Sequence, residues 1–155
     1  MTDIVNHQTC KHVSAMDCVD AAHLAIAVIA GHAELLRDAI ANGVPLGVSK
    51  LTAVSDAVLH NADRLDASLS LWRRLPADSL PGSHHRSVQR QIDAIRQHAD
   101  ELGHAALCAD SGTPPTADQL ATLADHLLAL TEPMHQAVIA AQAASIAPPP
   151  GAPLH

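Results

Sequence analysis

The chain of 155 residues has 48% hydrophobic and 16% charged residues, which is enough for one domain with a core and too little for two. Aromatic residues make up only 1%, and alanine is abundant. Because alanine is the strongest helix former and aromatic residues favour strands, this composition predicts an all-α protein. The formal net charge of −7 and the lack of a long run of Lys or Arg argue against binding of a nucleic acid.

The first predicted helix begins after Ser14, which forms a capping-box pattern with Asp17, and ends at Asn42-Gly43. Its apolar residues fall on two opposite faces at about 100° per residue. We assign to the core the face formed by Leu24, Val28, Gly31, Leu35 and Ala39. The other face is left for a partner, and we expect a homo-oligomer through this helix; the alternative is a solvated surface of small alanines. This expected interaction face consists of Val19, Ala22, Ile26, Ala30 and Ala33.

Three further helices follow, each with one apolar stripe for the core. Their matched lengths and short connections predict an up-down-up-down antiparallel four-helix bundle over residues 14–146. Flexible segments are expected at residues 1–13 and in the Pro-rich tail 147–155. The second helix is expected to begin after Ser49 and end at Leu75, and the third to run from about His84 to Asp110. The fourth is expected to begin after Thr116 and end at about Ile146. Thr116 forms a capping box with Gln119.

Two details refine this bundle. The run Gly31-His-Ala-Glu-Leu-Leu-Arg-Asp38 is similar to Gly103-His-Ala-Ala-Leu-Cys-Ala-Asp110, which is what a duplicated helical hairpin, or a chance match of Ala- and Leu-rich helices, would give. Pro133 lies inside the last helical pattern. Because proline lacks an amide hydrogen and clashes with the preceding turn, we expect a kink or break between Ala129 and Pro133.

The N-terminal segment collects donor groups that suit zinc or copper(I). Thiolate and imidazole are the preferred ligands of these ions. The spacing matches no zinc module, so a chance collection of donors is the alternative. The candidate ligands are His7, Cys10, His12 and Cys18.

Two Glu-x-x-His pairs, Glu101/His104 and Glu132/His135, have the spacing found in di-iron bundles. Both pairs lie away from the apolar stripes and at different heights of the bundle, so we expect them to face water rather than share a metal. A mixed site of His32 with His98 and Asp63, near the middle of the bundle, is a further alternative.

Enzymatic chemistry finds no support in the sequence. There is no Gly-rich phosphate loop and no nucleophile elbow, and Cys108 stands beside Asp110, whose charge disfavours a thiolate. The most apolar stretch, Ala21 to Gly31, is shorter than the ~20 residues of a membrane helix. With no secretory signal and only three Cys, we expect a cytoplasmic protein that is not an enzyme and does not enter a membrane.

One resemblance concerns about residues 20–72. The run Ile26-Ala-Val-Ile-Ala-Gly31-His-Ala-Glu34-Leu35-Leu36, followed by Leu51, Asn61-Ala-Asp-Arg64-Leu65 and Leu69, resembles the dimerisation and phosphotransfer hairpin of sensor histidine kinases. This resemblance implies a docking or pseudo-phosphotransfer module. The phosphoacceptor histidine would fall near Asp20, and the nearest histidine, His23, comes one turn later.

Taken together, these features favour a small soluble helical bundle that acts as a protein-interaction or regulatory module, whose protein partner the sequence does not identify. One alternative is a bundle that binds zinc or copper through His and Cys. Another is a phosphotransfer protein acting through His23 or His32.

Overall fold

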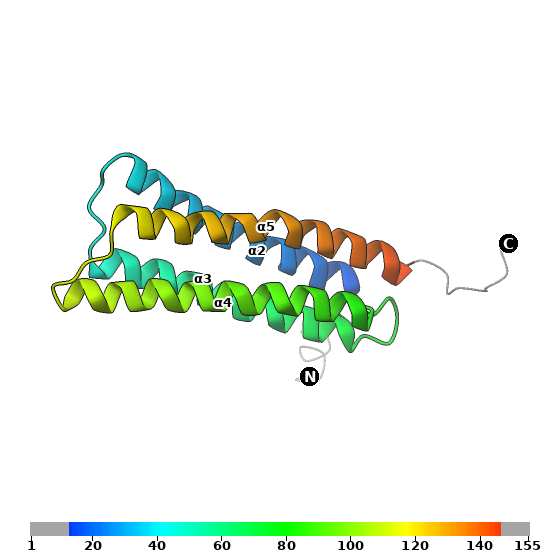
Figure 1. The fold of residues 1–155 in the computed structure, drawn as a ribbon. Helices are drawn as coiled ribbons and strands as arrows, with labels where there is room; N and C mark the ends of the chain where they lie inside the picture. The colour runs from blue at the N-terminus through cyan, green and yellow to red at the C-terminus, as the bar shows by residue number, and fades with distance from the viewer. Residues whose placement is uncertain (1–12, 147–155) are drawn as a thin grey trace, which may run out of the picture.

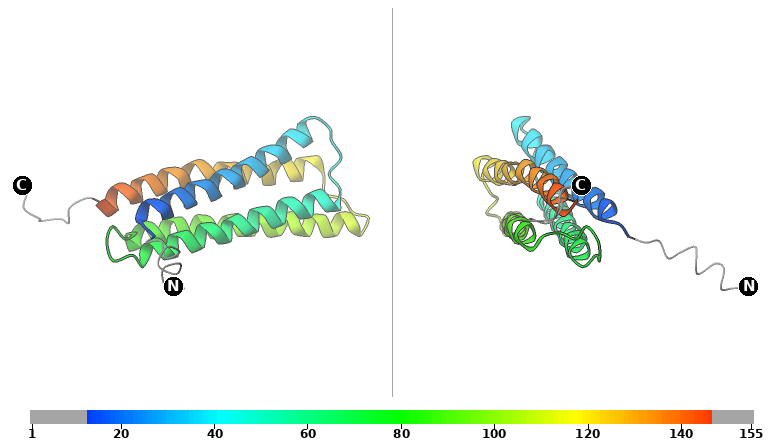
Figure 2. Two further views of the ribbon diagram at one scale, coloured as in Figure 1. Left: turned by 180° about the vertical axis from the view of Figure 1, so that it is seen from behind. Right: turned by 90° about the vertical axis from the view of Figure 1, so that its right-hand side faces the viewer.

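The computed structural model describes residues 13–146, which form four long helices (Figure 1). No strand occurs in this range. In both orientations α2 and α5 form one layer and α3 and α4 the other, and sequential helices run antiparallel (Figures 1 and 2). Each helix packs on two neighbours, which confirms the predicted up-down-up-down bundle. The helices are α2 (Ala15–Ala41), α3 (Val48–Arg73), α4 (Gly82–Asp110) and α5 (Ala117–Ile146).

The predicted caps account for the helix ends. The Ser14 hydroxyl accepts a hydrogen bond from the Asp17 amide, and the Asp17 carboxylate accepts one from the Ser14 amide. Thr116 and Gln119 make the same reciprocal pair at the start of α5. After α2 the chain turns at Gly43, where φ is +67°, a conformation that glycine adopts without strain. The two helices without a side-chain cap, α3 and α4, each begin two residues before the expected position.

Three of the four predicted core stripes are confirmed. Leu51, Leu65 and Trp72 of α3 are fully buried, as are most stripe residues of α4 and α5. The indole nitrogen of Trp72 donates a hydrogen bond to the Asp78 carbonyl oxygen at 2.8 Å. This bond holds the α3–α4 loop against the core, where Leu80 is also buried. Burial of the indole therefore leaves no polar atom unsatisfied.

The assignment of faces on α2 is wrong, because the structure reverses it. Val19, Ala22, Ile26 and Ala33, which were expected to meet a partner, are buried in the core, and Ala30 is half-buried. The expected core residues Leu24 and Leu35 are exposed instead. The buried face runs from Cys18 to Leu36, and the exposed Asp17 and Asp38 lie on the outer side of the helix. The small and β-branched side chains of the buried face also let the neighbouring helices approach closely.

The expected break at Pro133 does not occur, and α5 runs unbroken from Ala117 to Ile146. Proline removes one hydrogen bond, whose acceptor would be the carbonyl of Ala129. Both Ala129 and Pro133 are exposed, so water can replace the missing donor without burying a polar group. The Thr131 hydroxyl donates to the Leu128 carbonyl, not to that of Ala129.

Close packing between α3 and α4 depends on a glycine. The Ser55 hydroxyl donates to the Ala99 carbonyl at 2.8 Å, and a Cβ placed on Gly103 would lie 3.1 Å from the same hydroxyl oxygen. Gly103 therefore lets the two helices meet without a clash. Arg96 of α4 reinforces this contact by binding the carboxylates of Asp63 and Asp66 on α3.

Burial predicts a sharp difference between two substitutions on α3. Leu65→Ala should lower the free energy of unfolding by about 2 to 5 kcal/mol, because it leaves a cavity in the core. His60→Ala, at an exposed position, should change it by no more than about 0.5 kcal/mol. Urea denaturation followed by circular dichroism measures both. Equal losses would contradict the placement of the core.

Candidate functional site

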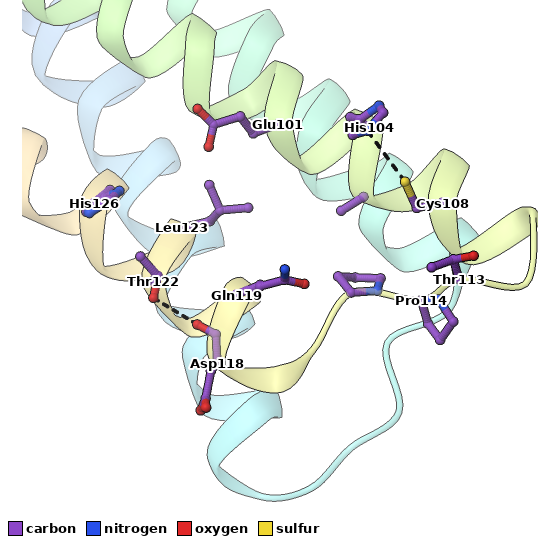
Figure 3. Close-up of a pocket in the computed structure, with 12 residues that line it drawn as sticks. Glu101, His104, Cys108, Thr113, Pro114, Asp118, Gln119, Thr122, Leu123 and His126 are labelled. Atoms are coloured by element: carbon purple, nitrogen blue, oxygen red, sulfur yellow. Dashed lines mark hydrogen bonds between the residues drawn. The ribbon is translucent and has the colours of Figure 1, made fainter.

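A cavity of about 610 Å³ lies between α4 and α5, next to the loop that joins them (Figure 3). These two helices pack less closely than the other neighbouring pairs, because α4 lies tightly on α3 and α5 on α2. The apolar part of the cavity wall consists of Ala105, Pro114, Pro115 and Leu123. Polar side chains reach it from both helices, namely Glu101, His104, Cys108, Asp118, Gln119, Thr122 and His126.

His104 and Cys108 form the closest pair of donor groups in this cavity. They are four residues apart on α4, so their side chains lie one turn apart on the same face. The Cys108 Sγ and His104 Nε2 atoms are 3.5 Å apart. Sequence reasoning compared Cys108 only with its neighbour Asp110 and missed this contact, although the spacing of four residues predicts it.

A second group of side chains lies beside the cavity, where Glu101 and His126 line it and His98 contacts both of them. The His98 ring lies against that of His126, with centroids 5.0 Å apart, and joins α4 to α5. His98 Nδ1 is buried, has no hydrogen-bond partner and lies 3.7 Å from a carboxylate oxygen of Glu101. Even so, no three His, Cys, Asp or Glu side chains within residues 13–146 are placed to hold one metal ion together.

His23 of α2 and His135 of α5 form another cross-helix pair. Their Nδ1 atoms are 2.8 Å apart and their rings are stacked. One Nδ1 must donate and the other accept, so the pair cannot hold a proton on both nitrogens. Burial lowers the pKa of His23, the nearby His135 lowers it further, and Asp20 opposes the change. The sequence offered no sign of this pair, because it depends on the register between α2 and α5.

The candidate metal ligands of the N-terminal segment are only partly described. His7, Cys10 and His12 lie outside the described residues. Cys18 is buried on the core face of α2, and burial, followed by the charge of Asp17, raises the pKa of its thiol. As placed, Cys18 is packed against other helices and does not present a thiolate to solvent.

The other metal-site alternatives are not assembled. Glu101, His104 and Glu132 are exposed, as expected, but His135 is half-buried against His23, so the expectation that both pairs face water is wrong for this residue. The two Glu-x-x-His pairs do not converge on a metal site within residues 13–146. The proposed mixed site also does not form, because His98 contacts His126 and Asp63 binds Arg96. His32 lies on the outer half of α2, not in the core.

The outer stripe of α2 is the second candidate site, defined here as Leu24, Val28, Gly31 and Leu35. Leu24 is 57% and Leu35 65% exposed, and both lie on the same face of α2. A shallow depression surrounds Gly31, with Val28, His32 and Leu35 at its edge. A Cβ at Gly31 would meet no atom within 4 Å. Packing within residues 13–146 therefore gives no reason for a glycine here.

By length and composition, α2 is also apolar enough to cross a membrane, unlike the other described helices. Core helices of soluble proteins pass the same test, and one face of α2 is buried within the bundle. Comparison with known proteins gives no match to any family model, curated protein or solved structure. Any functional conclusion therefore rests on the geometry of this chain.

The His23–His135 pair predicts a pH dependence of stability. Because the pKa of folded His23 lies below its ordinary value of 6.5, the unfolded chain binds more protons between these two values. The free energy of unfolding should therefore fall as the pH drops below 6.5, and His23→Gln should reduce this slope. Urea denaturation over a pH series measures it. His60→Gln is the control, and an unchanged slope in His23→Gln would refute the assignment.

Proposed function

We propose that this protein is a non-enzymatic interaction module that binds an amphipathic helix of another protein on the outer stripe of α2. The observation that carries the proposal is the exposure of Leu24 and Leu35 on the face of α2 directed away from the core. Contiguous exposed apolar side chains mark sites of protein or membrane interaction. The described part of the chain offers nothing that covers them.

The outer stripe has the spacing of a helix-binding seam. Its residues are separated by four, three and four positions, the interval at which one helix face meets another. Gly31 lies within this seam, where glycine costs an exposed helix up to about 1 kcal/mol relative to alanine. A close approach by a second helix would account for a glycine at this position, because small residues let two helix backbones come near each other.

Charge indicates what kind of helix fits. Asp20, Glu34 and Asp38 are all exposed and lie along one flank of the stripe at about 100° per residue. The opposite flank carries Ala21, His32 and Ala39. A partner helix with Lys or Arg along its matching flank complements these carboxylates. The sequence predicted a homo-oligomer through this helix, but a second copy would bring the same acidic flank, and the chain carries a net charge of −7.

This proposal agrees with the hairpin resemblance only in its docking role. His23 is half-buried and bonded through Nδ1 to His135, and the equivalent of the phosphoacceptor position is near Asp20. We therefore assign the α2–α3 hairpin to binding and not to phosphotransfer. The expected cytoplasmic location is part of the same proposal.

A designed peptide tests the proposal. The probe is an amphipathic helical peptide with Leu at the seam positions and Lys along one flank, titrated into the full chain by calorimetry. We expect saturable binding that weakens with added salt, because the flanking carboxylates contribute. Leu24→Gln with Leu35→Gln should abolish it. Gly31→Gln should weaken binding while leaving the chain at least as stable, since its side chain meets nothing in the fold.

Matched controls separate binding at the outer stripe from non-specific attraction between the peptide and the chain. Leu107→Gln removes an equally exposed leucine of α4, 67% exposed, and should leave binding unchanged. A peptide with Glu in place of Lys should not bind. The proposed partner would be contradicted if Leu107→Gln lost peptide binding equally, or if the acidic peptide bound. It would also be contradicted if the chain self-associated through Leu24 and Leu35 in sedimentation equilibrium. Partition of the chain into neutral phosphatidylcholine vesicles would contradict it as well.

A further inference from the structure

The cavity between α4 and α5 contains a pair of donor groups that the interaction proposal does not use. The His104 and Cys108 side chains point toward each other from successive turns of α4 (Figure 3). His104 is exposed and Cys108 half-buried at the edge of the cavity, so both are reachable from solvent. The contact between them is a weak hydrogen bond between thiol and imidazole.

The separation of the two donor atoms fits one metal ion. Zinc binds thiolate sulfur at about 2.3 Å and imidazole nitrogen at about 2.0 to 2.1 Å in a tetrahedral arrangement. These bond lengths place the two donor atoms about 3.5 Å apart, and Cys108 Sγ lies 3.5 Å from His104 Nε2. Because both residues lie one turn apart on one helix, an ion can bind both side chains without moving a helix.

The other close pair of donors in the bundle fails the same test. His23 and His135 hold their Nδ1 atoms 2.8 Å apart, a hydrogen-bond distance. Two imidazole ligands of one tetrahedral zinc are separated by about 3.3 Å, as its bond lengths require. The His23–His135 separation is therefore too short for a chelate, whereas the His104–Cys108 separation fits both the hydrogen bond in the structure and a chelated ion.

We propose that His104 and Cys108 form a binding site for a borderline-soft divalent ion, with zinc as the natural ligand, at the edge of the α4–α5 cavity. No third donor of residues 13–146 is already in place, so water fills the remaining positions, on the side open to the cavity. Glu101 and His126 line the same cavity and are the candidates for a third ligand. The site differs from the one expected in the N-terminal segment, because it uses none of those residues.

Binding is a proton-releasing exchange. The Cys108 thiol loses its proton to solvent, the neutral His104 imidazole supplies its Nε2 lone pair, and the hydrated ion releases water as it becomes four-coordinate, keeping water only in the positions that the two side chains do not fill. Because the thiolate is the ligand, the affinity rises with pH. An ion held here ties successive turns near the end of α4, beside the most loosely packed pair of helices.

Cobalt(II) titration of the full chain tests the site. The parent protein carries Cys10→Ser and Cys18→Ala, so that Cys108 is its only thiol, and is reduced and freed of metal by a chelator. We expect one equivalent of cobalt to give a thiolate-to-cobalt charge-transfer band that zinc then abolishes. His104→Gln should weaken binding by more than about tenfold, since loss of supporting groups alone costs that much. His60→Gln, an exposed histidine of α3, should bind as the parent does.

Three results would overturn the site. They are absence of the band in the parent, an unchanged affinity in His104→Gln, and an equal loss in His60→Gln. Circular dichroism of each variant without metal confirms that the fold is kept. As a second measure, zinc should raise the thermal midpoint of the parent and not that of Cys108→Ser, because an ion that binds the folded chain stabilises it. Neither residue lies on α2, so failure here leaves the helix-binding proposal unaffected.

Discussion

Burial of the small and β-branched face of α2 shapes the rest of this bundle. Ala22, Ile26, Ile29 and Ala33 are fully buried, and side chains of this size let α3 and α5 approach α2 closely. α5 packs more closely on α2 than on α4, and α4 lies on α3 through Gly103 and Ser55. The remaining interface, between α4 and α5, contains the cavity. The same choice of face leaves Leu24 and Leu35 of α2 outside the core.

The two proposed sites follow from these packing choices and are built from different chemistry. The outer stripe of α2 offers apolar area and a flank of carboxylates, which suits a macromolecular partner. The His104–Cys108 pair offers two directed lone pairs at a fixed separation, which suits an ion. A core with more aromatic volume would have filled the space between α4 and α5, but the chain has one Trp and neither Tyr nor Phe.

The sequence predicted those parts of the fold that depend on local chemistry. The capping boxes of Ser14 and Thr116 and the stripes of α3, α4 and α5 need only residue type and helical period, and all are confirmed. The faces of α2 were assigned wrongly because both are apolar, and hydrophobicity alone does not rank them. The acidic residues do: Asp20, Glu34 and Asp38 lie along a flank of the outer stripe, whereas the buried face carries no charged residue.

Features that depend on the register between helices were beyond the sequence. His23 and His135 are 112 positions apart, and their contact requires the relative height and rotation of α2 and α5. Gly31 and Gly103 occupy similar sequence runs, yet the first faces open space and the second contacts Ser55. By contrast, the His104–Cys108 contact is local, and its spacing could have been recognised as a chelating pair from the sequence.

The bond from Trp72 to Asp78 gives the molecule a natural optical reporter. The chain has one indole, it is fully buried, and its nitrogen is bonded to the α3–α4 loop, at the opposite end of the bundle from the α4–α5 loop (Figure 1). Its fluorescence therefore follows local order at one end, while backbone dichroism averages over all four helices. Coincident transitions of the two signals on heating would mean that the long bundle melts as one cooperative unit, and separated transitions would mean that its ends melt independently.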